Sequence, residues 1–194
     1  MSTARPAGAA AQRDTGHHSG AHPSGRRERR PRVCHDPHVT LTFRDEVRGP
    51  AFGELLEVLL PHAATVGLVD SGDYQGDEAL RLLAALDGKR ITTDESRAWP
   101  GSLVPDWAPA LIVYSFRYDR EVARTLYSHC PALLGWQTRG LPYDLHLTDS
   151  QGRSVLGSIT SEDDAWVEMR MVEWRRLVAG TRWLRRIRVR DDRG

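Results

Sequence analysis

The sequence predicts a single α+β domain in which a mixed sheet is flanked by helices and ends in an antiparallel β-meander. Three observations support this class. Between about residues 38 and 130, strand-like stretches alternate with stretches of helical spacing. After about residue 140, strand-like stretches follow one another and are joined by a polar, glycine-containing loop. The chain has 194 residues, 40% of them hydrophobic, which is enough for one core.

Composition divides the chain into three parts. Residues 1–37 are rich in Ala, Gly, Pro, Ser, His and Arg and have no hydrophobic period. We expect them to be a disordered tail, because they cannot bury enough apolar surface to offset the entropy of ordering. Residues 38–180 carry the periodic stretches and are predicted to form the α+β domain. Residues 181–194 are predicted to form a basic C-terminal arm.

Four elements are expected in the first half of the domain: a strand, a helix, a second strand and a second helix. They are predicted at residues 39–44, 50–60, 64–70 and 77–86. The first strand alternates apolar and polar residues, whereas ATVGLVD is a continuous apolar run typical of a buried strand. Pro50 suits the first turn of the first helix, and Pro61 ends it. Gly88 is the expected C-terminal cap of the second helix.

The next part begins with residues 92–109, which are expected to be irregular because three prolines interrupt them. The strongest strand signal in the chain follows, with large apolar side chains on one face. They are Ile112, Tyr114, Phe116 and Tyr118. Asp119 is the expected N-cap of the next helix, REVARTLYSHC, which Pro131 ends. The stretch YDLHLTDSQGRSVLGSIT then predicts a hairpin of two strands.

Residues 161–180 fit two structures. In a helix, Ser161 and Asp164 would be a capping pair, and apolar residues from Val167 to Val178 would form one stripe. In a strand, Val167 and Met169 would face the core after a polar SEDD turn. We favour a strand from about residue 165 to residue 170, because it continues the hairpin as a meander. It also leaves VEWRRLVAG as a helix that ends at glycine.

The net charge of +1 hides a segregation of charge along the chain. Residues 1–38 contain seven arginines and three acids, a charge of +4, and residues 175–194 contain eight arginines and two acids, a charge of +6. Residues 39–174 contain 12 basic and 21 acidic residues, a charge of −9. An acidic body between two basic arms bears on the choice of partner rather than on the fold.

Tryptophans in loops, together with the acidic body, resemble the combination of anchors and charges on a surface that binds a basic protein. The candidate partner-binding residues are Trp99, Trp107, Trp136, Asp163 and Asp164. Any single loop tryptophan, taken by itself, more often fills a gap in the core.

The loop DSGDYQGDE gathers carboxylates that could bind magnesium or calcium, or act in acid–base catalysis. These weak metal candidates are Asp70, Asp73, Asp77 and Glu78. Alternatively, the last two acids stabilise the N-terminus of a helix, and the rest is a solvated loop. The chain has no phosphate loop, serine elbow or dinucleotide glycine motif. The sequence therefore leans against an enzyme, and no cofactor is expected.

The C-terminal arm is the densest basic stretch. Its arginines could contact nucleic-acid phosphates, with Trp183 as a stacking partner. They are Arg185, Arg186, Arg188 and Arg190. The same stretch alternates arginines with Ile187 and Val189, so it also fits an edge strand or an arm folded back on the acidic body, which we favour.

No apolar run approaches the roughly 18 residues that a membrane span requires. The N-terminal AGAAA is too short for the apolar core of a signal peptide. We therefore expect a cytoplasmic protein without a membrane partner.

Three short motifs stand between Tyr127 and Met169: LLGW at 133–136, LP-x-DL at 141–145 and GSI at 157–159. Through these motifs the stretch resembles small actinobacterial α+β proteins, some of them immunity-like. Such proteins often continue with a His-Glu pair, but Ser161 and Glu162 stand here, so the resemblance implies no function for that histidine. It implies an α+β fold and an immunity-like role.

These observations favour a non-enzymatic interaction protein, of the immunity or antitoxin type, whose acidic face binds a basic protein partner. Two alternatives stay open. One is a nucleic-acid-associated regulatory protein that uses its basic arms, and the other is a metal-dependent enzyme that uses the acidic loop at residues 70–78.

Overall fold

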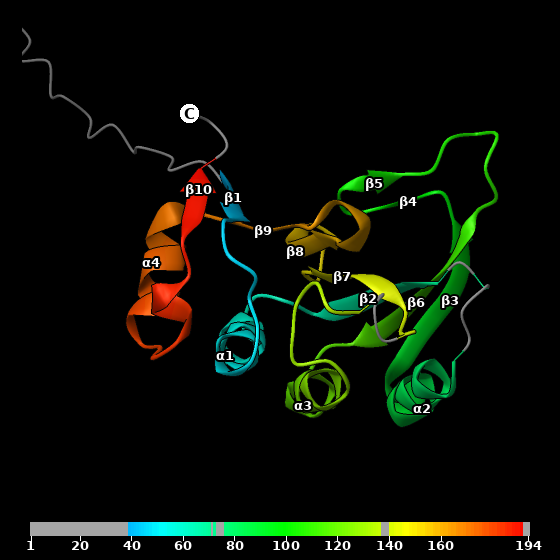
Figure 1. The fold of residues 1–194 in the computed structure, drawn as a ribbon, viewed down its shortest axis with the longest axis horizontal. Helices are drawn as coiled ribbons and strands as arrows, with labels where there is room; N and C mark the ends of the chain where they lie inside the picture. Colours follow the sequence, from blue (N-terminus) through cyan, green and yellow to red (C-terminus); the bar gives the residue numbers. More distant parts are fainter. Residues whose placement is uncertain (1–38, 71, 73–75, 137–139, 192–194) are drawn as a thin grey trace, which may run out of the picture. The chain divides into compact units, whose positions relative to one another are not determined.

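A computed structural model describes residues 39–70, 72, 76–136 and 140–191, which belong to the second of two units in the chain, residues 35–194. This unit is built around an eight-stranded sheet of order β10-β1-β9-β8-β7-β2-β6-β3 (Figure 1). The α+β class is confirmed. The tail expected to be disordered, residues 1–37, lies outside the described residues.

The strands of the sheet are β1 (Val39–Phe43), β2 (Thr65–Asp70), β3 (Arg90–Ser96), β6 (Leu111–Arg117), β7 (Tyr143–Thr148), β8 (Ser154–Ile159), β9 (Asp164–Met169) and β10 (Val189–Asp191). A separate hairpin pairs β4 (Ala98–Trp99) with β5 (Ser102–Leu103). The α-helices are α1 (Pro50–Leu59), α2 (Asp77–Leu86), α3 (Arg120–His129) and α4 (Met171–Ala179). Short 3₁₀ turns form η1 (Asp87–Lys89), η3 (Thr160–Glu162) and η4 (Leu184–Arg186).

The expected mixed character of the sheet was wrong, because every pairing between described strands is antiparallel. Strands joined by a helix usually lie side by side and parallel. Here strands from later in the chain lie between them: β6 separates β2 from β3, and the meander β7-β8-β9 separates β1 from β2. Each helical connection therefore joins two strands that run in the same direction but do not touch.

Residues 92–109 are not irregular, which corrects a second expectation. They contain most of β3, which pairs with β6 at the end of the strand order, and both strands of the β4-β5 hairpin. All residues of β3 except Ser96 are exposed, so the strand has no apolar face for a sequence pattern to reveal. Gly88 is not the cap of α2 either, because α2 ends at Leu86 with Asp87 as its C-cap, and the chain continues directly into η1.

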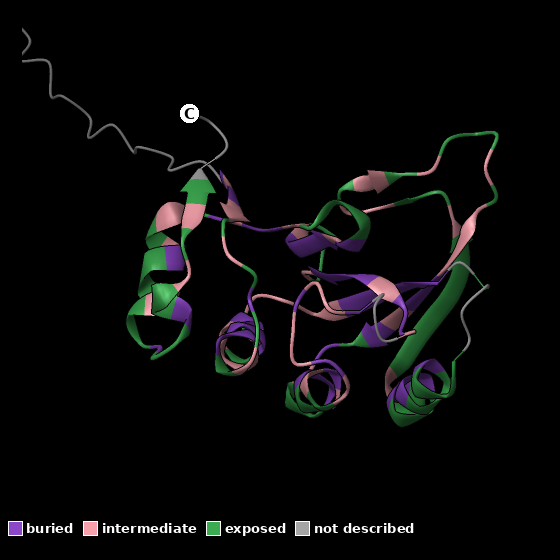
Figure 2. Cartoon of the chain, viewed as in Figure 1, coloured by how far each residue is buried: buried purple, intermediate pink, exposed green. Residues whose placement is uncertain are grey.

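The core lies between the sheet and a row of three helices, α1, α3 and α2 (Figure 1). Figure 2 shows the buried residues on the sides of these helices that face the strands. As the alternation in the sequence predicted, Tyr114, Phe116 and Tyr118 are buried, while Ile112 is half-buried near the sheet edge. Trp174 of α4 packs edge-on against Phe43 of β1, with ring centroids 5.9 Å apart.

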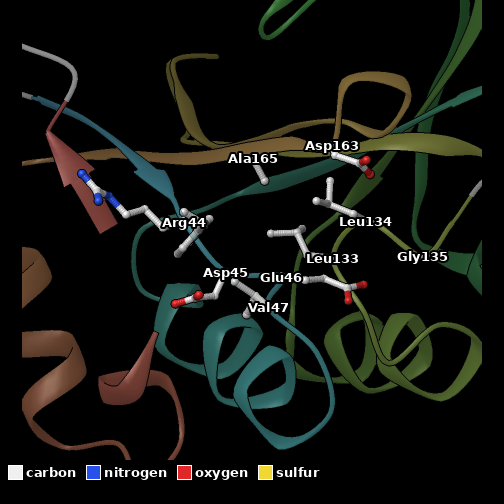
Figure 3. A pocket seen from close by; sticks show the side chains of 10 residues that line it. Arg44, Asp45, Glu46, Val47, Leu133, Leu134, Gly135, Asp163 and Ala165 are labelled. Carbon is white, nitrogen blue, oxygen red and sulfur yellow. The ribbon is translucent and has the colours of Figure 1, made fainter. Parts of the chain in front are cut away.

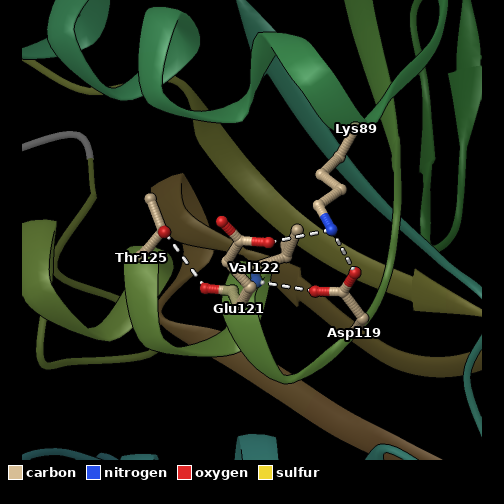
Figure 4. Close-up of polar contacts among 5 residues, drawn as sticks. All are labelled: Lys89, Asp119, Glu121, Val122 and Thr125. Atoms are coloured by element: carbon tan, nitrogen blue, oxygen red, sulfur yellow. Dashed lines mark hydrogen bonds and ion pairs between the residues drawn. The ribbon is translucent and has the colours of Figure 1, made fainter.

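Asp119 is the N-cap of α3, as predicted, and accepts a 3.0 Å hydrogen bond from the backbone NH of Val122 (Figure 4). The chain's single lysine, Lys89, lies 2.7 Å from Asp119 and 2.9 Å from Glu121. The hydrogen bond from Lys89 lowers the pKa of Asp119 below its ordinary value. One ammonium group therefore joins the end of η1 to the start of α3.

Residues 164–169 form the third strand of the meander, which confirms the favoured alternative. Val167 lies between Leu41 of β1 and Leu156 of β8, and both Val167 and Met169 are buried beneath the helices. Trp166 points to the opposite face of the sheet, where its indole NH donates to Glu168 at 3.1 Å. The helix that follows ends at Gly180, as expected.

Candidate functional site

The expected C-terminal arm folds as part of the domain. Leu184 is fully buried in the core, and the carboxylate of Glu54 in α1 accepts hydrogen bonds from the backbone NH groups of residues 182, 183 and 184 at 2.9, 2.7 and 2.7 Å. Burial by itself would raise the pKa of Glu54, but these three NH groups lower it below its ordinary value. The segment is therefore held by a charge-assisted cap from α1.

The last part of this segment forms β10, the edge strand beside β1. Just before it, Arg188 makes two side-chain hydrogen bonds to the carboxylate of Asp45, at 3.0 and 2.6 Å. These bonds lower the pKa of Asp45 to about 2. Arg188 was a candidate for contacting nucleic acid, but the structure commits its guanidinium to an ion pair within the domain.

The β4-β5 hairpin packs on part of the sheet face opposite the helices, over β7 and β9. The indole NH of Trp99 in β4 donates to the carboxylate of Asp144 in β7 at 3.0 Å, and Gly101 lies against the indole of Trp166. Asp144 is only 4% exposed and also accepts a 2.8 Å hydrogen bond from the backbone NH of Thr160. Burial raises the pKa of Asp144, and these hydrogen bonds oppose the rise. The carboxylate thus ties the hairpin to the meander.

His146 lies two residues further along β7 and is also buried. Its Nδ1 lies 3.0 Å from the backbone carbonyl of Asp144, so this nitrogen carries the proton and donates. Gly67 of β2 makes room for the ring, since a Cβ at that position would lie 1.9 Å from Nε2 of His146. Burial lowers the pKa of His146 below its ordinary value of 6.5.

This burial predicts a pH dependence of stability. The unfolded chain takes up a proton near pH 6.5, whereas folded His146 takes it up only at lower pH. Its contribution to stability is therefore present above pH 6.5 and is lost as the pH falls, by up to about 1.4 kcal/mol per pH unit. Urea titrations of the wild type and of His146→Gln between pH 7.5 and 5.5 should give a flatter profile for the variant. Parallel profiles would contradict this assignment.

The three loop tryptophans differ in how far they are buried. Trp136 was expected to contact a partner, but it is fully buried and belongs to the core, where its large apolar surface is removed from water. Trp99 is half-buried at the carboxylate of Asp144. Trp107 is 87% exposed on a turn that the Arg97 guanidinium holds through the carbonyls of Pro105 and Ala108, at 2.8 and 2.6 Å.

The acidic loop does not bring its carboxylates together. Asp70 is buried at the end of β2 and accepts a 2.9 Å hydrogen bond from the backbone NH of Gly72, whereas Asp73 lies outside the described residues. Asp77 and Glu78 lie in the exposed first turn of α2, where their negative charges stabilise the helix by interacting with its dipole. Among the residues that the structure describes, no group of three His, Cys, Asp or Glu residues could hold a metal ion.

A pocket of about 390 Å³ brings Asp163, a predicted partner-binding residue, together with apolar side chains. The sequence did not predict that these apolar side chains belong to a site. It is lined by residues 43–47 and 133–135, by Asp163 and by Ala165. The two chain segments meet through a backbone hydrogen bond from the NH of Leu133 to the carbonyl of Val47, at 2.9 Å. These contacts join residues that lie more than 80 positions apart, so no local sequence pattern could reveal them.

We call this site the acidic pocket. Val47, Leu133 and Ala165 are buried and supply apolar surface, and Leu134 is half-buried beside them. In Figure 3 the carboxylates of Glu46 and Asp163 lie on one side of this apolar surface. The side chains of Arg44 and Asp45 extend toward the other side, where Asp45 meets Arg188.

Asp163 owes its position to the backbone. It follows η3 with a φ of +52°, a left-handed conformation that aspartate adopts more readily than most residues. Its side chain is exposed and has no ion pair with another described residue, whereas Glu46 lies 3.5 Å from the exposed Arg48. Asp164, the neighbouring candidate, is half-buried in β9 and does not line the pocket.

Comparisons of this chain with protein-family models, with curated proteins and with solved structures find no match. Among the described helices, none has the length and apolar character needed to cross a bilayer. Function is therefore inferred from the pocket and from the distribution of charge over the fold.

Proposed function

We propose that the protein is a non-enzymatic interaction protein that binds a basic protein partner, and that a lysine or arginine of the partner enters the acidic pocket. The observation that carries this proposal is the combination of buried apolar walls with the carboxylates of Glu46 and Asp163. The volume of about 390 Å³ falls within the range of ligand sites.

The chemistry of the pocket suits a long cationic side chain. Lysine and arginine combine an apolar stem with a charged head, so the stem can pack on Leu133 and Leu134 while the head meets a carboxylate. Hydrogen bonds between ionised groups are about twice as strong as those between neutral ones. Residues 39–174 carry a charge of −9, and residues 175–191, which fold onto them, carry +6, so residues 39–191 have a net charge of −3. The acidic side of this domain would attract a basic protein.

An immunity or antitoxin role is one form of such binding, in which the protein would neutralise a basic toxin by covering its surface. The resemblance of residues 127–169 to immunity-like proteins supports this form. It includes Leu133, Leu134 and Gly135 of the acidic pocket. Co-expression with the products of adjacent genes, followed by purification of any complex, tests it directly.

The proposal predicts that removing two charges from the pocket weakens binding of the partner at least tenfold. Tagged wild type should recover a basic protein from a lysate of the native host at 50 mM salt, with recovery falling as the salt concentration rises. The double variant Glu46→Gln/Asp163→Asn should recover at least tenfold less, since each lost charge-assisted bond is worth about 1.5–3 kcal/mol.

A matched control removes two exposed carboxylates that do not line the pocket, in Asp94→Asn/Glu95→Gln of β3. This variant has the same net charge as the pocket variant and should recover the partner at near wild-type yield. Recovery of the partner by the pocket variant at the control level would refute the assignment to this pocket. Recovery of no protein by the wild type, even at low salt, would refute the proposed function itself.

A further inference from the structure

Exposed arginines gather around α4 and η4, on residues different from those of the acidic pocket. They are Arg175, Arg176, Arg182, Arg185 and Arg186, which we call the arginine surface. Figure 2 shows exposed residues along α4 and on the turn that follows it. We propose that the arginine surface binds the phosphate backbone of a nucleic acid.

The arginine surface carries an excess of positive charge, and the carboxylate of Glu54 interacts electrostatically with one member, Arg185. None of its five guanidinium groups forms an ion pair with a carboxylate of the described residues, in contrast to Arg188, which is paired with Asp45. Residues 175–190 contain no acidic residue in the sequence. A surface of this kind attracts polyanions, and binding releases the counterions that surround them.

Hydrogen bonds and burial hold the turn that carries three of the five arginines, Arg182, Arg185 and Arg186. Glu54 caps the NH groups of residues 182–184, Leu184 is buried in the core, and the hydroxyl of Thr181 accepts a 3.1 Å hydrogen bond from the NH of Arg185. Because these contacts hold the backbone of the turn before any ligand arrives, binding orders few further groups.

Trp183 organises two of the arginines. The guanidinium carbon of Arg182 lies 5.1 Å from the centroid of the Trp183 ring, and that of Arg186 lies 4.9 Å from it. The N–H donors of a guanidinium lie in its plane, so stacking on an indole restricts the group without using its donors. These donors can then form paired hydrogen bonds to phosphate oxygens.

The same observations favour nucleic acid over a membrane surface. A helix that lies on a membrane exposes an apolar face. Here Trp174 of α4 is buried, and Leu177 and Val178 pack against the core. The guanidinium contacts to Trp183 favour recognition of the repeating phosphates, without preference for a base sequence.

The test uses the full chain and two labelled duplexes of about 20 base pairs with mixed sequence, one DNA and one RNA, in fluorescence anisotropy titrations from 50 to 200 mM salt. The variant Arg182→Gln/Arg185→Gln/Arg186→Gln should lose at least tenfold in affinity. Its slope of log K against log salt for DNA should be shallower by about 3, because each phosphate contact contributes about 0.9. DNA and RNA separate the two sources of the same phosphate chemistry.

The control Arg117→Gln/Arg120→Gln/Arg124→Gln removes three exposed arginines of β6 and α3 and should change affinity less than threefold. A third variant, Arg182→Lys/Arg185→Lys/Arg186→Lys, should keep the slope while losing affinity, since lysine retains the charge but not the planar donor pair. This variant also keeps the proposal testable if the glutamine variant fails to fold.

Three outcomes would overturn the proposal. The wild type binds neither duplex at 50 mM salt, or the glutamine and lysine variants both bind as tightly as the wild type, or anionic lipid vesicles or polyglutamate bind more tightly than either duplex. Because the arginine surface shares no residue with the acidic pocket, none of these outcomes bears on the proposed protein partner.

Discussion

Replacing Val167 with aspartate is expected to lower the free energy of unfolding by about 4 kcal/mol or more, which is enough to unfold many domains of this size. Val167 is fully buried in β9 between Leu41 and Leu156. A carboxylate there would lose its hydration without gaining a hydrogen-bond donor or a cation, because its strand neighbours are aliphatic. Urea denaturation followed by circular dichroism measures the loss.

The same substitution at Val172 is a matched control. Val172 is 38% exposed in the first turn of α4. A negative charge at this position also interacts favourably with the helix dipole. Val172→Asp should stay within about 0.5 kcal/mol of the wild type. Met169→Lys, which buries a charge two residues further along β9, should again cost several kcal/mol. A loss under 0.5 kcal/mol for Met169→Lys is incompatible with the meander.

Gly157→Ala is expected to cost about 2–3 kcal/mol, a large effect for one methyl group. Gly157 in β8 pairs with Trp166 in β9, and a Cβ at position 157 would lie 2.2 Å from Cζ2 of the indole. The indole cannot move away easily, because Gly101 of the hairpin turn lies against its outer edge. The added methyl group must therefore displace either the strand or the hairpin that covers it.

A double-mutant cycle tests this explanation. In a Trp166→Leu background the smaller side chain leaves room, so Gly157→Ala should cost at least about 1 kcal/mol less than in the wild type. Gly88→Ala is the control, because a Cβ at position 88 meets no atom within 4 Å and the backbone there is not left-handed. Equal costs of Gly157→Ala in both backgrounds would exclude the indole as the cause.

Several elements could be predicted from the sequence because their causes are local. Pro50 at the start of α1 and Asp119 at the N-cap of α3 act within one helical turn. The alternation of large apolar residues along β6 reflects one buried face of a single strand. The meander followed from the continuity of β9 with the hairpin before it, although its residues also fit a helix.

The order of the strands was decided by tertiary structure. A helix between two strands predicts a parallel neighbour, yet β6 separates β2 from β3 and the sheet is antiparallel throughout the described strands. Strand β3 was missed for a related reason. It lies at the sheet edge with exposed polar side chains, so its pairing depends on backbone hydrogen bonds to β6 rather than on an apolar pattern.

The features of the candidate sites also differ in whether local sequence or tertiary structure determines them. The segregation of charge and the exposure of Arg185 follow from composition and local polarity, which a sequence displays directly. The acidic pocket, the burial of Trp136 and the capping of residues 182–184 by Glu54 depend on segments that meet only in the fold. Contacts at such separations carry no local periodicity, so only the three-dimensional packing of the chain determines them.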